Sequence, residues 1–115
     1  MIKALPLLLL AAACAPVENA GLPAARDRDG HFILPPQCGP AELAKVDVPV
    51  RYIPRSTPIL HGPEGPRDGV WVRVAGVSYI FIRDDLIGWA KAGAEAHEKC
   101  HQVRFETTGS PVFHR

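Results

Sequence analysis

Residues 69–83 read GVWVRVAGVSYIFIR, and this stretch carries the clearest strand pattern in the chain. Its two halves, VWVRV and VSYIFI, are rich in β-branched and aromatic side chains, which favour pleated strands. The Ala75-Gly76 pair between them is suited to a tight turn, so we expect a β-hairpin. Since YIFI at 79–82 is apolar on both faces, we expect the second strand to be central in a sheet or well covered.

The segment that follows, residues 84–109, has the pattern of one long helix. It contains no proline and is rich in Ala, Glu and Lys. Asp84 and Asp85 end the strand and offer an N-cap, with negative charge at the positive end of the helix. Gly109 supplies a stop. Because Gly93 and nearby alanines leave a face of small side chains, we expect another part of the chain to lie close to the helix there.

The residues before the hairpin predict shorter elements. Residues 46–53 alternate apolar and polar side chains and indicate a strand, which Pro49 assigns to the edge of a sheet. Residues 41–46 favour a short helix, and the four prolines and three glycines of residues 54–69 indicate a long surface loop without a regular element. The expected fold class is therefore α+β: a small sheet with a β-hairpin, followed by one long helix. The aromatic side chains expected in the core are Trp71, Tyr79, Phe81, Trp89 and Phe105.

The N-terminal residues, MIKALPLLLLAAAC, have the pattern of a secretory signal. Lys3 precedes an apolar run that is too short to span a bilayer as a helix, and three alanines and Cys14 end the run. A cysteine in this place resembles a bacterial lipobox, which implies removal of residues 1–13 and lipidation of Cys14. Ordinary signal-peptide cleavage is the alternative. Because Ala15 rather than an aspartate follows Cys14, the resemblance favours the outer membrane; the expected location is the outer membrane or the periplasm.

The remaining chain divides into a linker and one small domain. Residues 14–30 are small, polar and punctuated by Pro and Gly, as in a flexible tether, and residues 31–115 are the expected domain. The formal net charge of +1 gives no electrostatic footprint for nucleic acid and no basic helix for a membrane surface. We therefore expect no nucleic-acid partner, and a lipid anchor as the attachment to the membrane.

Two cysteines remain once Cys14 carries lipid. Cys38 and Cys100 are then an even pair in an oxidising compartment, and we expect a disulfide between them. A small exported domain gains from such a staple, which on loop-entropy reasoning contributes on the order of 4 kcal/mol. Two free thiols, or Cys100 as a metal ligand, are the alternatives.

The long predicted helix carries HEKCH at residues 97–101, a match to the HExxH pattern. On a helix, His97 and His101 point the same way one turn apart, so both imidazoles can reach one ion. Glu98 lies about 100° round the helix from His97, where it flanks the ion without binding it. A zinc ion would lower the pKa of a bound water, and Glu98 would take its proton as hydroxide attacks a carbonyl. A solvated helix face without metal is the alternative.

A strand followed directly by a helix with HEKCH resembles the zincin metallopeptidases, over about residues 70–114. In that family an edge strand beside the active-site helix binds extended substrate. The resemblance implies a zinc-dependent hydrolase, a peptidase of the cell envelope that acts on peptides or proteins. The glycine and third histidine that follow HExxH closely in the metzincin branch are absent here. A non-catalytic envelope lipoprotein, with a structural metal site or none, is the alternative function.

A catalytic zinc site usually has three protein ligands, so HEKCH leaves one to be found. We expect His114 to supply it. Gly109 can end the helix in a left-handed cap and Pro111 prevents the helix from resuming, so the tail can fold back along it. A frayed tail is the alternative, since His114 is the penultimate residue.

Other candidate ligands are placed less well. Glu106 lies about 140° round the helix from His101 and therefore points elsewhere. His31 and His61 lie in predicted loops and are expected to be surface residues.

Overall fold

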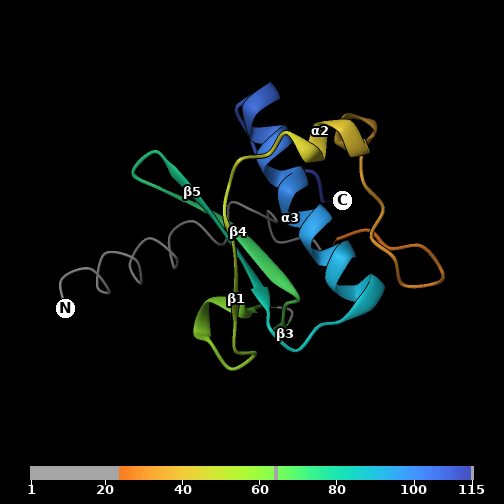
Figure 1. Ribbon diagram of the computed structural model, residues 1–115, viewed down its shortest axis with the longest axis vertical. Helices are drawn as coiled ribbons and strands as arrows, with labels where there is room; N and C mark the ends of the chain where they lie inside the picture. The colour runs from red at the N-terminus through yellow and green to blue at the C-terminus, as the bar shows by residue number, and fades with distance from the viewer. Residues whose placement is uncertain (1–23, 64, 115) are drawn as a thin grey trace.

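The structure is a computed structural model that describes residues 24–63 and 65–114. The expected signal segment, Cys14 and residues 14–23 of the expected tether lie outside the described residues. The fold is α+β, as predicted: a three-stranded sheet packs against one long helix, beside a second sheet of two short strands (Figure 1). In chain order the elements are η1 (Pro36–Cys38), α2 (Pro40–Ala44), β1 (Val50–Ile53), η2 (Pro58–Leu60), β2 (His61–Gly62), β3 (Gly65–Pro66), β4 (Gly69–Val74), β5 (Val77–Arg83) and α3 (Gly88–Thr108).

Strands β4 and β5 form the predicted hairpin and pair antiparallel along the whole of β4. Ala75 and Gly76 make the turn, with φ angles of 51° and 81°. Two-residue hairpin turns need this left-handed backbone, because it matches the twist of the flanking strands. β5 is the central strand in the order β1-β5-β4, as its apolar sequence predicted.

β1 lies at the edge of the sheet, as Pro49 predicted, and runs parallel to β5. It is shorter than the predicted 46–53 and begins at Val50, directly after the proline, which has no amide hydrogen for a ladder. The short helix α2 forms one residue earlier than expected. The prediction of no regular element over 54–69 is wrong, because η2 and the β2–β3 pair form there.

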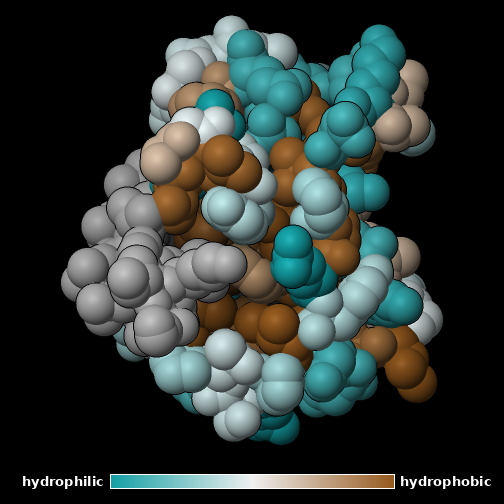
Figure 2. Space-filling view, turned by 60° about the vertical axis from the view of Figure 1, so that its left-hand side comes forward, coloured by the Kyte–Doolittle hydropathy of each residue, from teal (hydrophilic) through white to brown (hydrophobic). Residues whose placement is uncertain are grey.

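The two faces of the sheet are covered by different elements. Because side chains alternate along a strand, one face packs on α3 and the other on the η2 segment (Figure 1). The α3 side buries Trp71, Ile80, Ile82 and Ala94, and the η2 side buries Leu60, Val70, Val72 and Phe81. Figure 2 shows that apolar side chains also reach the surface among polar ones.

One of the aromatic side chains expected in the core is exposed. Trp89 is 59 % exposed, so its predicted burial is wrong. Helix α3 begins at Gly88, which places Trp89 in its first turn, beside the still more exposed Ile87. The other four aromatic residues are buried or pack against the core, as predicted.

The predicted N-cap of the long helix is also wrong. The N-cap residue of α3 is Ile87, which makes no side-chain cap hydrogen bond. Asp85 instead accepts two hydrogen bonds from the Arg83 guanidinium, at 2.9 and 2.8 Å, so its carboxylate is turned back toward β5. The other end follows the prediction: Gly109 has a φ of 81° and donates its amide hydrogen to the Phe105 carbonyl at 2.8 Å.

Cys38 of η1 and Cys100 of α3 form the expected disulfide, with Cα atoms 5.5 Å apart. Val103 is buried with the two sulfurs, and Leu34 and Phe113 pack against them. The bridge therefore fastens the segment before α2 to the turn of α3 that carries HEKCH. Among the described residues, no helix has the length and apolar character needed to cross a membrane.

Residues 25–33 form a tight turn that lies against α3, and we call this segment the N-terminal turn. Arg26 and Phe32 pair as an antiparallel bridge, and the Asp27 carboxylate accepts two backbone amides inside the turn. The Arg26 guanidinium lies 3.8 Å from the centre of the Phe32 ring and 3.4 Å from the Asp68 carboxylate. A Cβ atom on Gly93 would be 3.9 Å from the Phe32 ring. This turn is therefore the segment that approaches the small side chains of the helix.

Candidate metal centre

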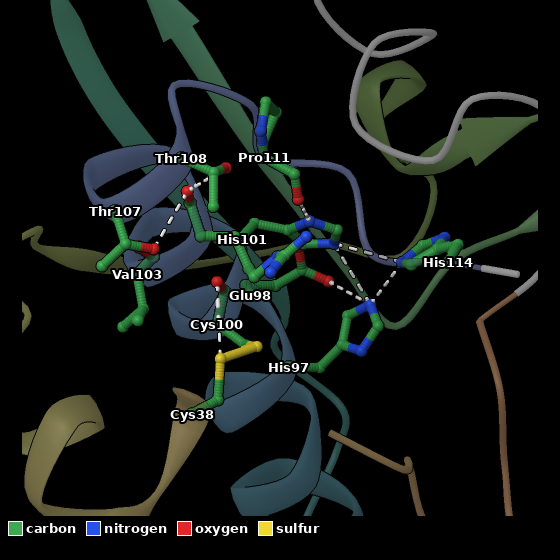
Figure 3. Close-up of a disulfide and its surroundings, with 11 residues drawn as sticks. Cys38, His97, Glu98, Cys100, His101, Val103, Thr107, Thr108, Pro111 and His114 are labelled. Atoms are coloured by element: carbon green, nitrogen blue, oxygen red, sulfur yellow. Dashed lines mark hydrogen bonds and ion pairs between the residues drawn. A yellow bond between two sulfur atoms is a disulfide. The ribbon is translucent and has the colours of Figure 1, made fainter. Parts of the chain in front are cut away.

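Three imidazole rings meet at one point beside α3 (Figure 3). Nε2 of His97 is 2.9 Å from Nε2 of His114 and 3.3 Å from Nε2 of His101, and the last two are 3.2 Å apart. His97 and His101 lie one helical turn apart on α3, and His114 comes from the tail. The three side chains lie close enough to hold one metal ion.

The spacing of these nitrogens suits a small tetrahedral ion. Zinc binds imidazole nitrogen at about 2.0–2.1 Å, so two ligands of a tetrahedral zinc are about 3.3–3.4 Å apart. The observed triangle has sides of 2.9, 3.2 and 3.3 Å. Small ring rotations would open its short side to the expected value.

The tail that carries His114 also fixes the orientation of a helix histidine. After the Gly109 cap the chain returns along α3, and the Pro111 carbonyl oxygen lies 2.8 Å from Nδ1 of His101. A carbonyl can only accept, so Nδ1 carries the proton and Nε2 presents its lone pair to the centre. A hydrogen bond of this kind is the usual device that orients a metal-binding imidazole.

Burial keeps the two helix histidines neutral. It lowers the pKa of His97 well below its ordinary value, and the charges of His101 and His114 when protonated act in the same direction. Burial also lowers the pKa of His101 to about 3, although the hydrogen bond to Pro111 raises it. Neutral imidazole is the form that binds a metal, so neither ligand has to lose a proton at neutral pH.

Glu98 points to the same centre from the next position of α3 (Figure 3). Its carboxylate oxygens lie 4.0 Å from Nε2 of His97 and 3.9 Å from Nε2 of His101, and the residue is 3 % exposed. These distances exceed the spacing of about 3.3–3.4 Å between two ligands of one zinc ion. The carboxylate therefore flanks the centre and is not one of the side chains that form it.

Gly69, the first residue of β4, lets the strand lie close to Glu98 because it has no side chain. A Cβ atom on Gly69 would lie 3.2 Å from Cγ of Glu98, 2.9 Å from the Phe81 carbonyl oxygen and 2.7 Å from Cδ1 of Ile82. A larger residue would therefore push against both the sheet and the carboxylate. This role was not predicted from the sequence; a glycine opening a strongly apolar strand was the only signal, and the strand pattern alone does not reveal what faces it.

Two aromatic rings close the centre from outside. The Phe32 ring stacks on His97 with centroids 4.2 Å apart, and the Phe113 ring lies 4.4 Å from His101. As a result His97 is 3 % exposed and His101 is fully buried. Neither phenylalanine was predicted as a site residue, because each belongs to a segment without a regular pattern.

The other candidate ligands lie elsewhere. His31 stacks on Trp89, and His61 contacts the Arg55 carbonyl at 3.2 Å. Glu106 accepts a hydrogen bond from Gln102 at 2.7 Å. Cys100 is held in the disulfide. The cluster of three histidines therefore forms without any of these four candidates.

Comparisons of the chain with protein-family models, with curated proteins and with solved structures found no match.

Proposed function

We propose that the chain is a zinc-dependent hydrolase of the zincin type, with zinc held by His97, His101 and His114 and with Glu98 as the general base. The observation that carries the proposal is the convergence of three imidazole nitrogens 2.9–3.3 Å apart beside a buried carboxylate. Three protein ligands leave one position of a tetrahedral zinc for water or substrate, which distinguishes catalytic sites from closed structural ones.

Zinc is the metal that best fits this donor set. Imidazole nitrogens suit zinc, copper and nickel, whereas magnesium and calcium take oxygen ligands. The three nitrogens are nearly equidistant, at 2.9, 3.2 and 3.3 Å. Three corners of a square-planar site would include one longer diagonal, so the arrangement favours zinc over copper(II) and nickel(II). The carboxylate beside the triangle adds the base that zinc hydrolysis needs.

The residues of this chain divide the chemistry between them. When bound, zinc supplies a Lewis acid that lowers the pKa of water and polarises a carbonyl. Glu98 takes the proton of the attacking water and later delivers it to the leaving amine. Its carboxylate is 3.9–4.0 Å from two ligand nitrogens, a distance that supports contact with the water rather than with the ion. Pro111 keeps His101 in the tautomer that binds.

Catalysis also requires access for a substrate. Phe32 covers His97 and is held by Arg26, whose ion pair with Asp68 is solvent-exposed at 42 % on the arginine side. A partly exposed ion pair of this kind contributes about 0–1 kcal/mol, so Arg26 can move together with Phe32 at little cost from its pairing with Asp68. We propose that substrate binding moves this ring.

A second function has its own support. The burial of His97 and His101 under Phe32 and Phe113 also suits a structural metal that fastens the tail to α3 in a non-catalytic envelope lipoprotein. The experiment that separates the two compares wild type with Glu98→Gln. Both proteins are loaded with zinc, and cleavage of a mixed library of short peptides is read by mass spectrometry.

The catalytic proposal expects about one zinc per chain in both proteins and hydrolysis in the wild type alone. Glu106→Gln is the matched control, because it removes a carboxylate of the same helix that lies outside the histidine cluster. Zinc binding without hydrolysis in any of the proteins would favour the structural function. Hydrolysis that survives Glu98→Gln would remove Glu98 from the mechanism.

We further propose that the protein acts in the cell envelope, in the periplasm or at the outer membrane, anchored through Cys14 and acting on peptides or proteins. The disulfide of Cys38 with Cys100 supports an oxidising compartment. Wild type should partition into detergent and Cys14→Ser should not. A wild-type protein with an unmodified Cys14 would rule out the anchor.

A further inference from the structure

A pocket of about 360 Å³ lies beside the candidate metal centre, between the N-terminal turn and the first half of α3. Its volume is in the range of pockets that take small ligands. The apolar residues that line it are Phe32, Leu34, Trp89, Ala90, Ala92, Gly93 and Ala96. Three of these are large side chains that border the space, and four are small helix residues that leave it open.

The lining selects an uncharged, apolar ligand. The polar part of the lining consists of His31, whose ring stacks on Trp89, and of two residues of opposite formal charge, Arg26 and Asp68, which lie 3.4 Å from each other. The charges of Arg26 and Asp68 therefore offset one another, and neither side chain offers an unpaired charge to a charged ligand. At Gly93, a Cβ atom would approach the Phe32 ring at 3.9 Å and would otherwise project into the open space.

The distance between the pocket and the candidate metal centre is one that an extended peptide can span. Gly93 precedes His97 by four residues, so it lies on the same side of α3, about 6 Å along the helix axis. An extended peptide advances about 3.3 Å per residue, so side chains two residues apart are about 6.6 Å apart on one face. Phe32 lies between the two places, because it lines the pocket and stacks on His97.

We propose that this pocket receives an apolar side chain, aromatic or branched aliphatic, of a peptide whose scissile bond lies at the metal centre. The inference rests on the proposed function and names its substrate class. The side chain belongs to a residue one or two positions from that bond. A ligand that shifts Phe32 as it enters the pocket also uncovers His97.

The test measures binding without hydrolysis. The zinc-loaded chain carrying Glu98→Gln is titrated with capped pentapeptides that differ at one position, either phenylalanine or aspartate, which is moved along the peptide. Binding is followed by calorimetry and by tryptophan fluorescence, because Trp89 lines the pocket. At one position, the phenylalanine peptide is expected to bind at least tenfold more tightly than its aspartate counterpart.

A second substitution, Gly93→Leu, fills the pocket in the same background. It should reduce the preference for phenylalanine to less than twofold while the zinc content stays unchanged. Leucine favours the helix more than glycine does, which supports folding of the variant. Ala90→Leu, also in the pocket lining, is a second filling variant, and Lys91→Leu adds a leucine at an exposed position outside the lining. Lys91→Leu should keep the preference.

The outcomes separate this inference from the proposed function. Equal binding of the two peptides at every position, or a preference that survives both filling variants, would overturn the pocket assignment even if wild type hydrolyses peptides. A preference that the filling variants abolish supports the assignment even if wild type hydrolyses nothing. In that second case only the proposed catalysis fails.

Discussion

Substitution of His114 by alanine tests the part of the centre that lies outside HEKCH. The side chain contributes one of three nitrogens, with its Nε2 atom 2.9 and 3.2 Å from those of His97 and His101. Structural zinc sites with four ligands bind with about 10–16 kcal/mol, or about 2.5–4 kcal/mol per ligand. Loss of one ligand should therefore weaken zinc binding by about a hundredfold to a thousandfold, since about 1.4 kcal/mol corresponds to a factor of ten.

The assay is a competition titration with a chromophoric zinc chelator on the full chain. His61→Ala is the matched control, because His61 is exposed and its ring contacts the Arg55 carbonyl of its own loop. The control should keep wild-type affinity. Wild-type zinc affinity in His114→Ala would refute the three-histidine centre and would indicate instead a site formed by His97, His101 and Glu98.

Three further predictions follow from the same contacts. Gly69→Ala should lower the free energy of unfolding by about 1–3 kcal/mol, which thermal unfolding would measure. It should also slow the hydrolysis that depends on Glu98 while zinc stays bound, which kinetics would measure. Unchanged values would contradict the close approach of β4 to Glu98. Phe32→Ala should speed removal of zinc by a chelator severalfold, because the ring covers one face of the centre, whereas Ile33→Ala at the exposed neighbouring position should not. Without metal, the folded chain holds His101 neutral with a pKa of about 3 against 6.5 when unfolded. Between these two pKa values the unfolded chain binds one more proton than the folded chain. The free energy of unfolding should therefore be highest above about pH 6.5 and decrease toward pH 3, by up to about 1.4 kcal/mol per pH unit. Denaturant titrations would measure this, and a flat profile would contradict the buried neutral state of His101.

The sequence predicted the elements whose signals are local. The hairpin depends on strand-forming residues on either side of Ala75-Gly76, and both turn residues have the required positive φ angles. The end of α3 depends on one glycine. The pairing of Cys38 with Cys100 was predicted from their number and compartment, without knowledge of the fold.

The failed predictions at the start of α3 concern choices between competing partners. Asp85 was expected to cap α3, but Arg83 two residues earlier offers a two-pronged hydrogen bond, and the helix starts later. That later start leaves Trp89 in the first turn and exposed. Phe32 covers His97 through a contact 65 positions apart in the sequence, and no periodicity relates such residues.

X-ray absorption at the zinc edge of the purified wild-type chain tests the central claim most directly. We predict one zinc per chain, bound by three imidazole nitrogens at about 2.0–2.1 Å and one oxygen ligand. That is the set formed by His97, His101 and His114 with an open fourth position. A chain that takes up no zinc when saturated, or a spectrum with fewer than three imidazole ligands, would contradict it.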